Sequence, residues 1–167
     1  SKITAVIGAR GGSGTTTTAI NMAVGMAEGQ QETILVDLDQ VQGHISLYLN
    51  QQVTGGVSDL ATIDPNYMEG EILSRLIPYK DNLNLLLNKP NITGRRPILE
   101  PLQTKYLAET LGGLGQNIIV DGGCGVTEFN QPFIEQANRV VVCLQPERVS
   151  VSAAKQLLVR VNKLMGE

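Results

Sequence analysis

Short apolar runs alternate along the chain with stretches in which apolar residues recur at helical spacing. The runs lie at residues 3–7, 33–37, 83–87, 117–120 and 140–144, and nearly every position in them is apolar. Such runs are typical of strands that are buried on both faces of a parallel sheet. The helical stretches lie between or after them, at residues 19–27, 67–77, 98–111, 129–137 and 151–164.

This alternation predicts an α/β fold, with a three-layer, doubly wound, mainly parallel sheet that has helices on both faces. A chain of 167 residues is long enough to bury its own core, so we expect residues 1–167 to form a single domain. The core must come mainly from Ile, Leu, Val and Ala, since the chain has four Tyr, two Phe and no Trp.

Composition and charge exclude several classes of protein. No apolar run approaches the roughly 20 residues that cross a bilayer, and no leader pattern opens the chain, so we expect a cytoplasmic protein without a transmembrane segment. Cys124 and Cys143 lack a disulfide pattern, and we expect both thiols to stay reduced. The net charge is −3, and the basic pair Arg95–Arg96 is interpreted as a solvated loop. Direct nucleic-acid binding is therefore not expected.

A segment rich in glycine and threonine, residues 8–18, joins the first predicted strand to the first predicted helix. Backbone N–H groups and the helix dipole favour an anion at such a junction, and phosphate is the natural ligand. Gly11, Gly12 and Gly14 let the backbone wrap closely around a polyphosphate. The Thr16 hydroxyl stands where phosphate loops hold Mg²⁺.

The strict phosphate-loop pattern G-x-x-x-x-G-K-[ST] nevertheless fails at two positions. Ala9 replaces its first glycine, and Thr15 replaces the lysine that reaches the β- and γ-phosphates. A glycine-rich turn without a ligand is the alternative interpretation. The four consecutive threonines favour a ligand, because threonine is a poor helix former unless a cap or a ligand uses its hydroxyl.

Acidic residues follow two of the predicted strands. Asp37 and Asp39 stand at the end of one strand, and Asp121 closes another. The carboxyl ends of parallel strands meet at one edge of an open sheet, where ligands bind, and three carboxylates there invite a cation such as Mg²⁺. Each Asp alone is as well explained by the capping of a turn, but with the glycine-rich segment the three favour a site. Gly125 would let the following loop swing toward a γ-phosphate.

Residues 10–23 resemble the deviant Walker A box of the ParA/MinD ATPases, K-G-G-x-G-K-T-T-x-A-x-N-x-A. The matching positions are Gly11, Gly12, Gly14, Thr16, Thr17, Ala19, Asn21 and Ala23. Both lysines of the box are absent, since Arg10 stands at the first and Thr15 at the second. Residues 36–49 are similar to the segment V-D-L-D-x-x-x-G-D-x-x-L-Y-L of the CpaE/TadZ pilus-assembly branch, with His44 in place of the Asp that follows the Gly in this segment.

The resemblance implies how the chain would hold ATP or ADP with Mg²⁺. The phosphates would lie on Gly11, Gly12, Ser13, Gly14, Thr15, Thr16 and Thr17. Thr16 and Asp121 would hold Mg²⁺, with Asp37 of the acidic cluster as a further ligand. Asp39 would orient the attacking water. Arg10 would replace the lysine that crosses to the nucleotide of a partner subunit, since guanidinium binds phosphate bidentately.

The loss of the phosphate-loop lysine predicts at most a weak ATPase. A hydroxyl cannot neutralise γ-phosphate charge, and losing such a contact costs about 10²- to 10³-fold in rate. The leading hypothesis is therefore a homodimer that binds ATP and Mg²⁺ and positions pilus or secretion machinery at the inner membrane or a cell pole. The alternatives are an active partitioning ATPase of the ParA/MinD type and a nucleotide-free scaffold.

The resemblance also bears on the extent of the domain. Typical members continue into strands that help to cradle adenine, so we expect residues 1–167 to be a ParA/MinD-like nucleotide-binding domain without its C-terminal strands and without an upstream domain. His44 is expected on the surface or facing a partner rather than on a metal, because no second His or Cys stands at ligand spacing.

Overall fold

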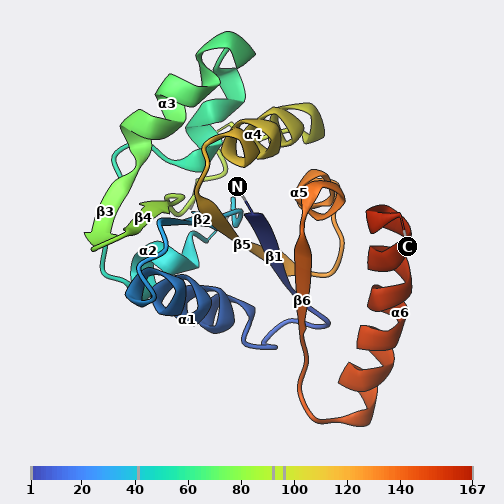
Figure 1. Cartoon of the computed structure of the whole chain (residues 1–167). Helices are drawn as coiled ribbons and strands as arrows, with labels where there is room; N and C mark the ends of the chain where they lie inside the picture. Colours follow the sequence, from blue (N-terminus) through green and yellow to red (C-terminus); the bar gives the residue numbers. More distant parts are fainter. Residues whose placement is uncertain (1, 41, 92, 96, 167) are drawn as a thin grey trace.

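The computed structural model describes residues 2–40, 42–91, 93–95 and 97–166, and Arg96 of the basic pair lies outside them. The described residues form one six-stranded sheet that carries helices on both faces (Figure 1). Across the sheet the strand order is β3 (Ile77–Lys80), β4 (Leu83–Leu86), β2 (Thr33–Asp37), β5 (Asn117–Cys124), β1 (Lys2–Gly8) and β6 (Arg139–Cys143). Every pair of neighbours runs parallel except β3 and β4. The predicted fold class is confirmed.

The antiparallel strand β3 is the part of the sheet that the sequence pattern did not predict. The helix expected over residues 67–77 is wrong at its end, because α3 (Met68–Arg75) stops before β3 begins. Pro78 lies within β3, which occupies the edge of the sheet. Proline is tolerated at an edge, where its missing N–H leaves no ladder hydrogen bond unmade.

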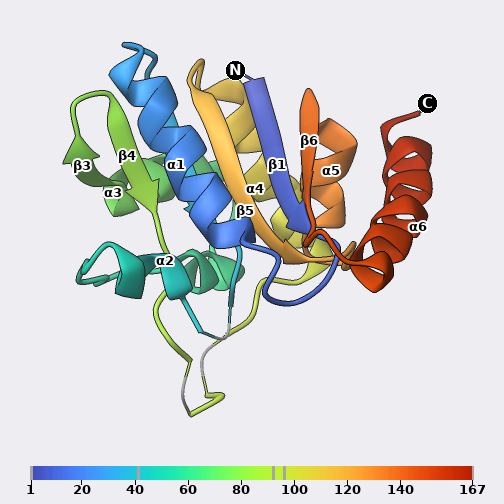
Figure 2. The same cartoon turned by 90° about the horizontal axis from the view of Figure 1, so that it is seen from below.

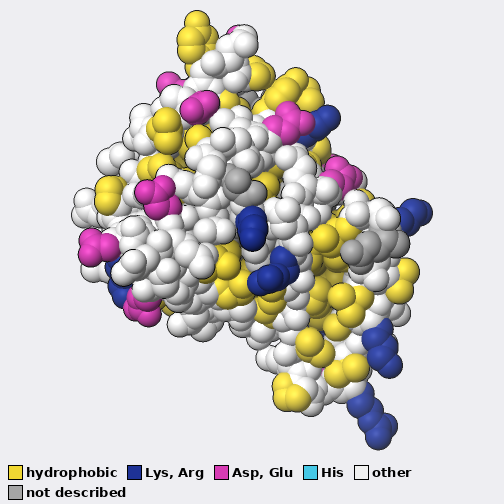
Figure 3. Space-filling model, in the orientation of Figure 1, with side chains coloured by type: hydrophobic (Ala, Val, Ile, Leu, Met, Phe, Trp, Pro, Cys, Tyr) yellow, Lys and Arg dark blue, Asp and Glu magenta, His cyan; other side chains and the backbone are white. Residues whose placement is uncertain are grey.

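Different helices cover the two faces of the sheet. α1 (Thr15–Glu28) packs on one face through alanines spaced four residues apart, which let the helix approach the strands closely. On the opposite face lie α3, α4 (Pro101–Gly113) and α5 (Gln131–Gln136). Neighbouring strand residues point to opposite faces, so Leu35 faces α1 while Ile34 and Val36 belong to the other cluster. Strands β1, β2, β4 and β5 are thus largely buried on both sides, as their apolar runs predict. β6 is only partly buried, and apolar side chains remain at the surface on that side of the molecule (Figure 3).

The remaining predicted helices are present with shifted bounds. α4 begins at Pro101, a residue that suits the first turn, and α6 (Arg148–Met165) begins three residues before the predicted start. α6 lies beside β6, at the end of the sheet opposite β3 (Figure 1). The short elements between β2 and α3 are α2 (His44–Tyr48), η1 (Val57–Thr62) and η2 (Pro65–Tyr67). Within the described residues, no helix has both the length and the apolar character needed to cross a membrane.

The parallel strands bring distant parts of the chain to one edge of the sheet. Asp121 of β5 pairs with Val6 of β1 on one side and with Asp37 of β2 on the other. The loop between β1 and α1 and the loops that follow β2 and β5 therefore lie at the same edge, as Figure 2 shows. Cys124 and Cys143 are both free, as expected.

Candidate functional site

The loop between β1 and α1 has a conformation that depends on its glycines. Gly12 and Gly14 have φ angles of 76° and 80°, in the left-handed region that favours glycine. Gly14 forms the N-cap of α1, and its carbonyl accepts the first hydrogen bond of the helix from the Thr18 N–H at 2.9 Å. Gly8 is needed for close packing, because a Cβ there would lie 2.5 Å from the Thr15 hydroxyl oxygen. This is the predicted junction of strand, glycine loop and helix.

Neighbouring segments hold this loop in place. The Ala9 N–H donates to the Cys143 carbonyl at 2.8 Å, and the Gln145 side-chain amide donates to the Gly12 carbonyl at 3.0 Å. The Ser13 hydroxyl donates to the Arg10 carbonyl at 2.6 Å. The segment between β6 and α6 therefore holds the loop from outside, and this role of Gln145 was not predicted.

Arg10 makes a contact within its own chain. Its Nη1 lies 2.9 Å from Oε1 of Glu147, the residue just before α6, and both side chains are about half exposed. The role predicted for Arg10 toward the nucleotide of a partner subunit stays a prediction, while the structure places its side chain beside the start of α6. The structure also reveals Glu147 as the partner of Arg10, which sequence reasoning missed because 137 residues separate the two.

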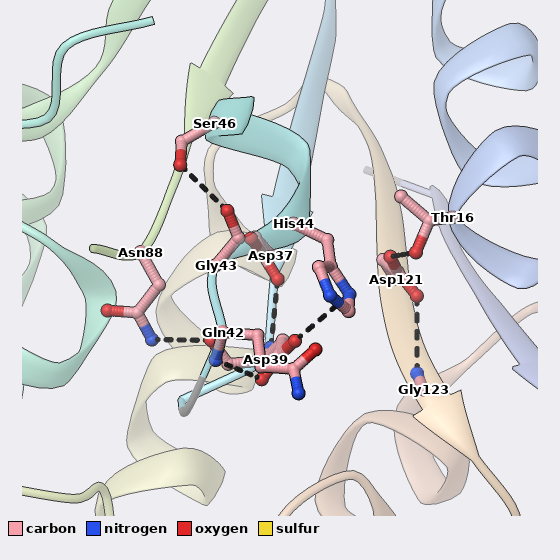
Figure 4. A network of polar contacts seen from close by, with 10 residues as sticks. All are labelled: Thr16, Asp37, Asp39, Gln42, Gly43, His44, Ser46, Asn88, Asp121 and Gly123. Carbon is pink, nitrogen blue, oxygen red and sulfur yellow. Dashed lines mark hydrogen bonds and ion pairs between the residues drawn. The ribbon is translucent and has the colours of Figure 1, made fainter. Parts of the chain in front are cut away.

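Thr16 and Asp121 meet across the edge of the sheet. The Thr16 hydroxyl donates to Oδ2 of Asp121 at 2.6 Å, and the Gly123 N–H donates to Oδ1 at 3.2 Å (Figure 4). Asp121 is almost fully buried. Burial raises the pKa of its carboxyl above the ordinary value, and the hydrogen bonds from Thr16 and Gly123 oppose this rise.

Asp37 lies beside Asp121 on the neighbouring strand and is completely buried. Its Oδ1 accepts a hydrogen bond from the Asp39 N–H at 2.8 Å, whereas its Oδ2 has no hydrogen-bond partner among the residues that the structure describes. Burial raises the pKa of Asp37 to about 8, and the nearby carboxylates of Asp121 and Asp39 add to the rise. Without a cation nearby, burial therefore favours the protonated, neutral form of Asp37.

Asp39 begins a tightly bonded turn between β2 and α2. Its Oδ1 accepts from the Gln42 N–H at 2.9 Å, and its carbonyl accepts from the Asn88 side-chain amide at 3.2 Å. Its Oδ2 lies 3.4 Å from Nδ1 of His44, the first residue of α2 (Figure 4). His44 is exposed, as expected, and its ring also lines the site beside Asp39, a contact that sequence analysis did not predict.

A single cavity of about 580 Å³ collects these groups. The loop between β1 and α1 lines one part of the cavity, α2 lines another, and the end of β5 with the loop that follows lines a third. Its lining is Arg10, Gly11, Gly12, Ser13, Gly14, Thr15, Thr16, Thr17, Leu38, Asp39, Gln40, His44, Tyr48, Ile98, Asp121, Gly122, Gly123, Cys124, Thr127, Phe129 and Asn130. Every predicted site residue is in this lining except Asp37, which lies buried behind it. The apolar residues Tyr48, Ile98 and Phe129 were not predicted.

The oxygen atoms at this edge suit Mg²⁺ chemically. Thr16, Asp37 and Asp121 offer a hydroxyl and carboxylates, and the Asp37 oxygen without a partner is the kind of atom that a nearby cation would satisfy. Among the described residues, no group of three or more His, Cys, Asp or Glu side chains is arranged to hold a metal ion by itself. The residues therefore fit an ion that shares its coordination with phosphate and water, as Mg²⁺ commonly does, rather than a closed protein cage.

Comparisons with known proteins agree with this geometry. Residues 1–167 match the family model described as an AAA domain. The chain is 30% identical over 156 residues to the chromosome-partitioning ATPase Soj of Thermus thermophilus, and this match covers 93% of the chain but 59% of Soj. Among solved structures, the septum site-determining protein MinD of Pyrococcus horikoshii, complexed with Mg-ADP, matches with a TM-score of 0.81 and 17% identity, over 97% of this chain and 65% of MinD.

A ParA family ATPase from Chlorobium tepidum matches in the same way, with a TM-score of 0.79 and 20% identity, over 95% of this chain and 67% of the ATPase. At these identities the solved structures establish the fold, which is that of the ParA and MinD ATPases. The chain spans about three fifths of the length of Soj.

Proposed function

Because the chain belongs to the AAA domain family and has the ParA/MinD fold, we propose that it binds ATP with Mg²⁺ in the 580 Å³ cavity. The observation that carries this proposal is a combination of two features at one edge of the sheet. Gly12 and Gly14 in the loop have left-handed φ angles, and Thr16, just after the loop, donates to Asp121 at 2.6 Å. Amides at the start of α1 would bind phosphate oxygens. Thr16 and Asp121 would hold Mg²⁺, with Asp37 beside them, and the bound ion would neutralise phosphate charge.

We propose that the site acts by binding ATP rather than by hydrolysing it. Thr15 stands where phosphate loops carry a lysine, and a hydroxyl supplies no charge to a developing γ-phosphate transition state. Arg10 is directed to Glu147 of its own chain. We therefore propose weak or absent ATP hydrolysis.

The biological role that fits such a domain is positioning. The similarity of residues 36–49 to the CpaE/TadZ segment supports a homodimer that recruits pilus or secretion machinery in the cytoplasm, at the inner membrane or a cell pole. In this account residues 1–167 are the nucleotide-binding domain. ATP would favour the assembled form, and Arg10 would leave Glu147 to reach the nucleotide of the partner subunit.

Calorimetric titration with the slowly hydrolysed analogue ATPγS tests the proposal. We expect one site per chain in the presence of Mg²⁺, and much weaker binding after Thr16→Ala. We also expect phosphate release from ATP to stay near the buffer background. Absence of binding at millimolar ATPγS and Mg²⁺ would leave the nucleotide-free scaffold as the better description.

One observation favours an active partitioning ATPase as the second candidate. Asp39 lines the cavity and is held by hydrogen bonds from Gln42 and Asn88, so its carboxylate is preorganised to orient a water molecule. The curated relative Soj is named as an ATPase. Steady-state phosphate release well above background that disappears in Asp39→Ala would favour this candidate.

A further inference from the structure

We propose that His44 is the specificity residue that distinguishes a nucleoside triphosphate from a diphosphate in this site. Its imidazole would contact the terminal phosphate and so replace the lysine that the phosphate loop lacks. This inference rests on the proposed nucleotide binding and adds a residue for which the sequence pattern suggested no role.

The charges that line the cavity single out His44. Of the described lining residues, Arg10 and His44 alone are basic, whereas Asp39 and Asp121 are acidic. Arg10 pairs at 2.9 Å with Glu147, which is not among the lining residues, whereas Asp39, the partner of His44, belongs to the lining itself. His44 is thus the basic side chain of this chain that remains in the cavity to meet a phosphate. A terminal phosphate carries the most charge of the polyphosphate, and a hydrogen bond to such a charged group is stronger than a neutral one.

The backbone places His44 firmly. Gly43, just before it, has a φ of 59°, and a Cβ at Gly43 would lie 2.7 Å from the Asn88 carbonyl oxygen. The Ser46 hydroxyl donates to the Gly43 carbonyl at 2.7 Å, and the Asn88 amide donates to the Asp39 carbonyl. These hydrogen bonds and the close approach at Gly43 hold the backbone from which the His44 ring projects.

The orientation of the His44 ring also supports the proposal. Figure 4 shows the imidazole between Asp39 and Asp121, with Thr16 on the far side of Asp121. Nδ1 faces Asp39 at 3.4 Å, so Asp39 orients the ring and Nε2 lies at its other end. Because the loop and α2 line the same cavity, a polyphosphate bound to the amides of the loop would extend toward α2 and bring its last phosphate near His44. ADP ends one phosphate earlier and would not make this contact.

The test compares two nucleotides on the same variants. Dissociation constants for ATPγS and ADP, both with Mg²⁺, are measured by calorimetry for the wild-type chain, His44→Gln and His44→Lys. A lost hydrogen bond to a charged group predicts that His44→Gln weakens ATPγS about tenfold to a hundredfold and leaves ADP unchanged. His44→Lys, which restores a donor with positive charge, should recover most of the preference. Leu47→Ala, an exposed change on α2 outside the cavity lining, is the matched control and should change neither constant.

The outcomes separate this inference from the proposed function. If His44→Gln weakens ATPγS and ADP equally, His44 only supports the fold of the site, and the inference is wrong while nucleotide binding stands. If both dissociation constants stay at their wild-type values, the inference is also wrong and nucleotide binding again stands. If the wild-type chain binds neither nucleotide, the proposed function fails and the inference fails with it.

Discussion

The hydroxyl of Thr16 donates a 2.6 Å hydrogen bond to the carboxylate of Asp121, although 105 residues separate the two in the chain. Thr16 stands in the first turn of α1, and Asp121 lies in β5, the strand between β1 and β2. The parallel pairing of β1 with β5 brings them together. This contact joins the loop between β1 and α1 to the edge of the sheet where Asp37 and Asp121 lie. It marks the position at which Mg²⁺ would bind.

Replacing Thr16 tests this junction. Thr16→Ala removes both the hydrogen bond to Asp121 and the proposed Mg²⁺ ligand, so we expect the affinity for ATPγS with Mg²⁺ to fall about tenfold to a hundredfold. Thr16→Ser keeps the hydroxyl and should retain most of the affinity. Calorimetry in Mg²⁺ and in EDTA measures the effect. If the Thr16→Ala chain kept the wild-type, Mg²⁺-dependent affinity, Thr16 would not be a ligand of Mg²⁺.

The ion pair between Arg10 and Glu147 predicts an effect on assembly rather than on stability. Both side chains are half exposed, so Glu147→Gln should change the free energy of unfolding by about 0.5 kcal/mol or less. Freed from Glu147, Arg10 would be more available to a partner subunit. Light scattering with ATPγS should therefore show more dimer for Glu147→Gln than for wild type, and less for Arg10→Ala. Equal dimer fractions in all three would contradict a role for Arg10 across subunits.

Burial of Asp37 predicts how stability depends on pH. An Asp in an unfolded chain loses its proton near pH 3.9, whereas burial raises the pKa of Asp37 to about 8 in the folded chain. Between these values the folded state holds the extra proton, so the free energy of unfolding should fall as pH rises from about 4 to 8. The raised pKa of Asp121 acts in the same direction.

Asp37→Asn tests this dependence, since it keeps an oxygen for the Asp39 N–H and removes the ionisable group. Urea unfolding at pH 5 and pH 8 without nucleotide should show a smaller decline for Asp37→Asn than for wild type, by an amount on the order of a few kcal/mol. The exposed change Asp81→Asn is the control and should keep the wild-type slope. Parallel slopes for wild type and Asp37→Asn would show that Asp37 is ionised in the folded chain.

Close packing at Gly8 predicts a cost for a single methyl group. A Cβ there would meet the Thr15 hydroxyl oxygen at 2.5 Å and the Arg10 carbonyl oxygen at 3.1 Å, so Gly8→Ala should destabilise the chain by about 1–3 kcal/mol. Gly25→Ala is a matched comparison, because Gly25 lies inside α1 with nothing within 4 Å of an added Cβ. That change should stabilise the chain by up to about 1 kcal/mol. Thermal unfolding that ranks the two variants in the opposite order would contradict this account of the loop.

Much of the fold could be predicted from the apolar pattern alone. Strands β1 and β2 lie within one residue of their predicted positions, because runs buried on both faces leave a continuous signal. Strand β3 was missed because four residues that include Pro78 carry no such signal, and the preceding helix has a stronger one. Its antiparallel pairing with β4 follows from a tight connection that only the structure shows.

The site could be predicted only in part. The glycine segment, Asp39 and Asp121 were found because their signal is local or lies at a strand end. The contacts of Arg10 with Glu147 and of Gln145 with Gly12 join residues more than 130 positions apart, and no pattern in one sequence reports them. The contact of His44 with Asp39 was not predicted, because it depends on the direction of a side chain at the start of a short helix, and spacing does not encode that direction.

A crystal structure of the chain with ATPγS and Mg²⁺ tests directly whether the loop between β1 and α1 binds phosphate. We predict phosphate oxygens within hydrogen-bond distance of the backbone N–H groups between Gly11 and Thr17, and Mg²⁺ on the Thr16 hydroxyl. A loop that stays free of nucleotide at saturating concentration, or a nucleotide bound elsewhere with the Thr16–Asp121 hydrogen bond intact, would show that this loop is not a phosphate site.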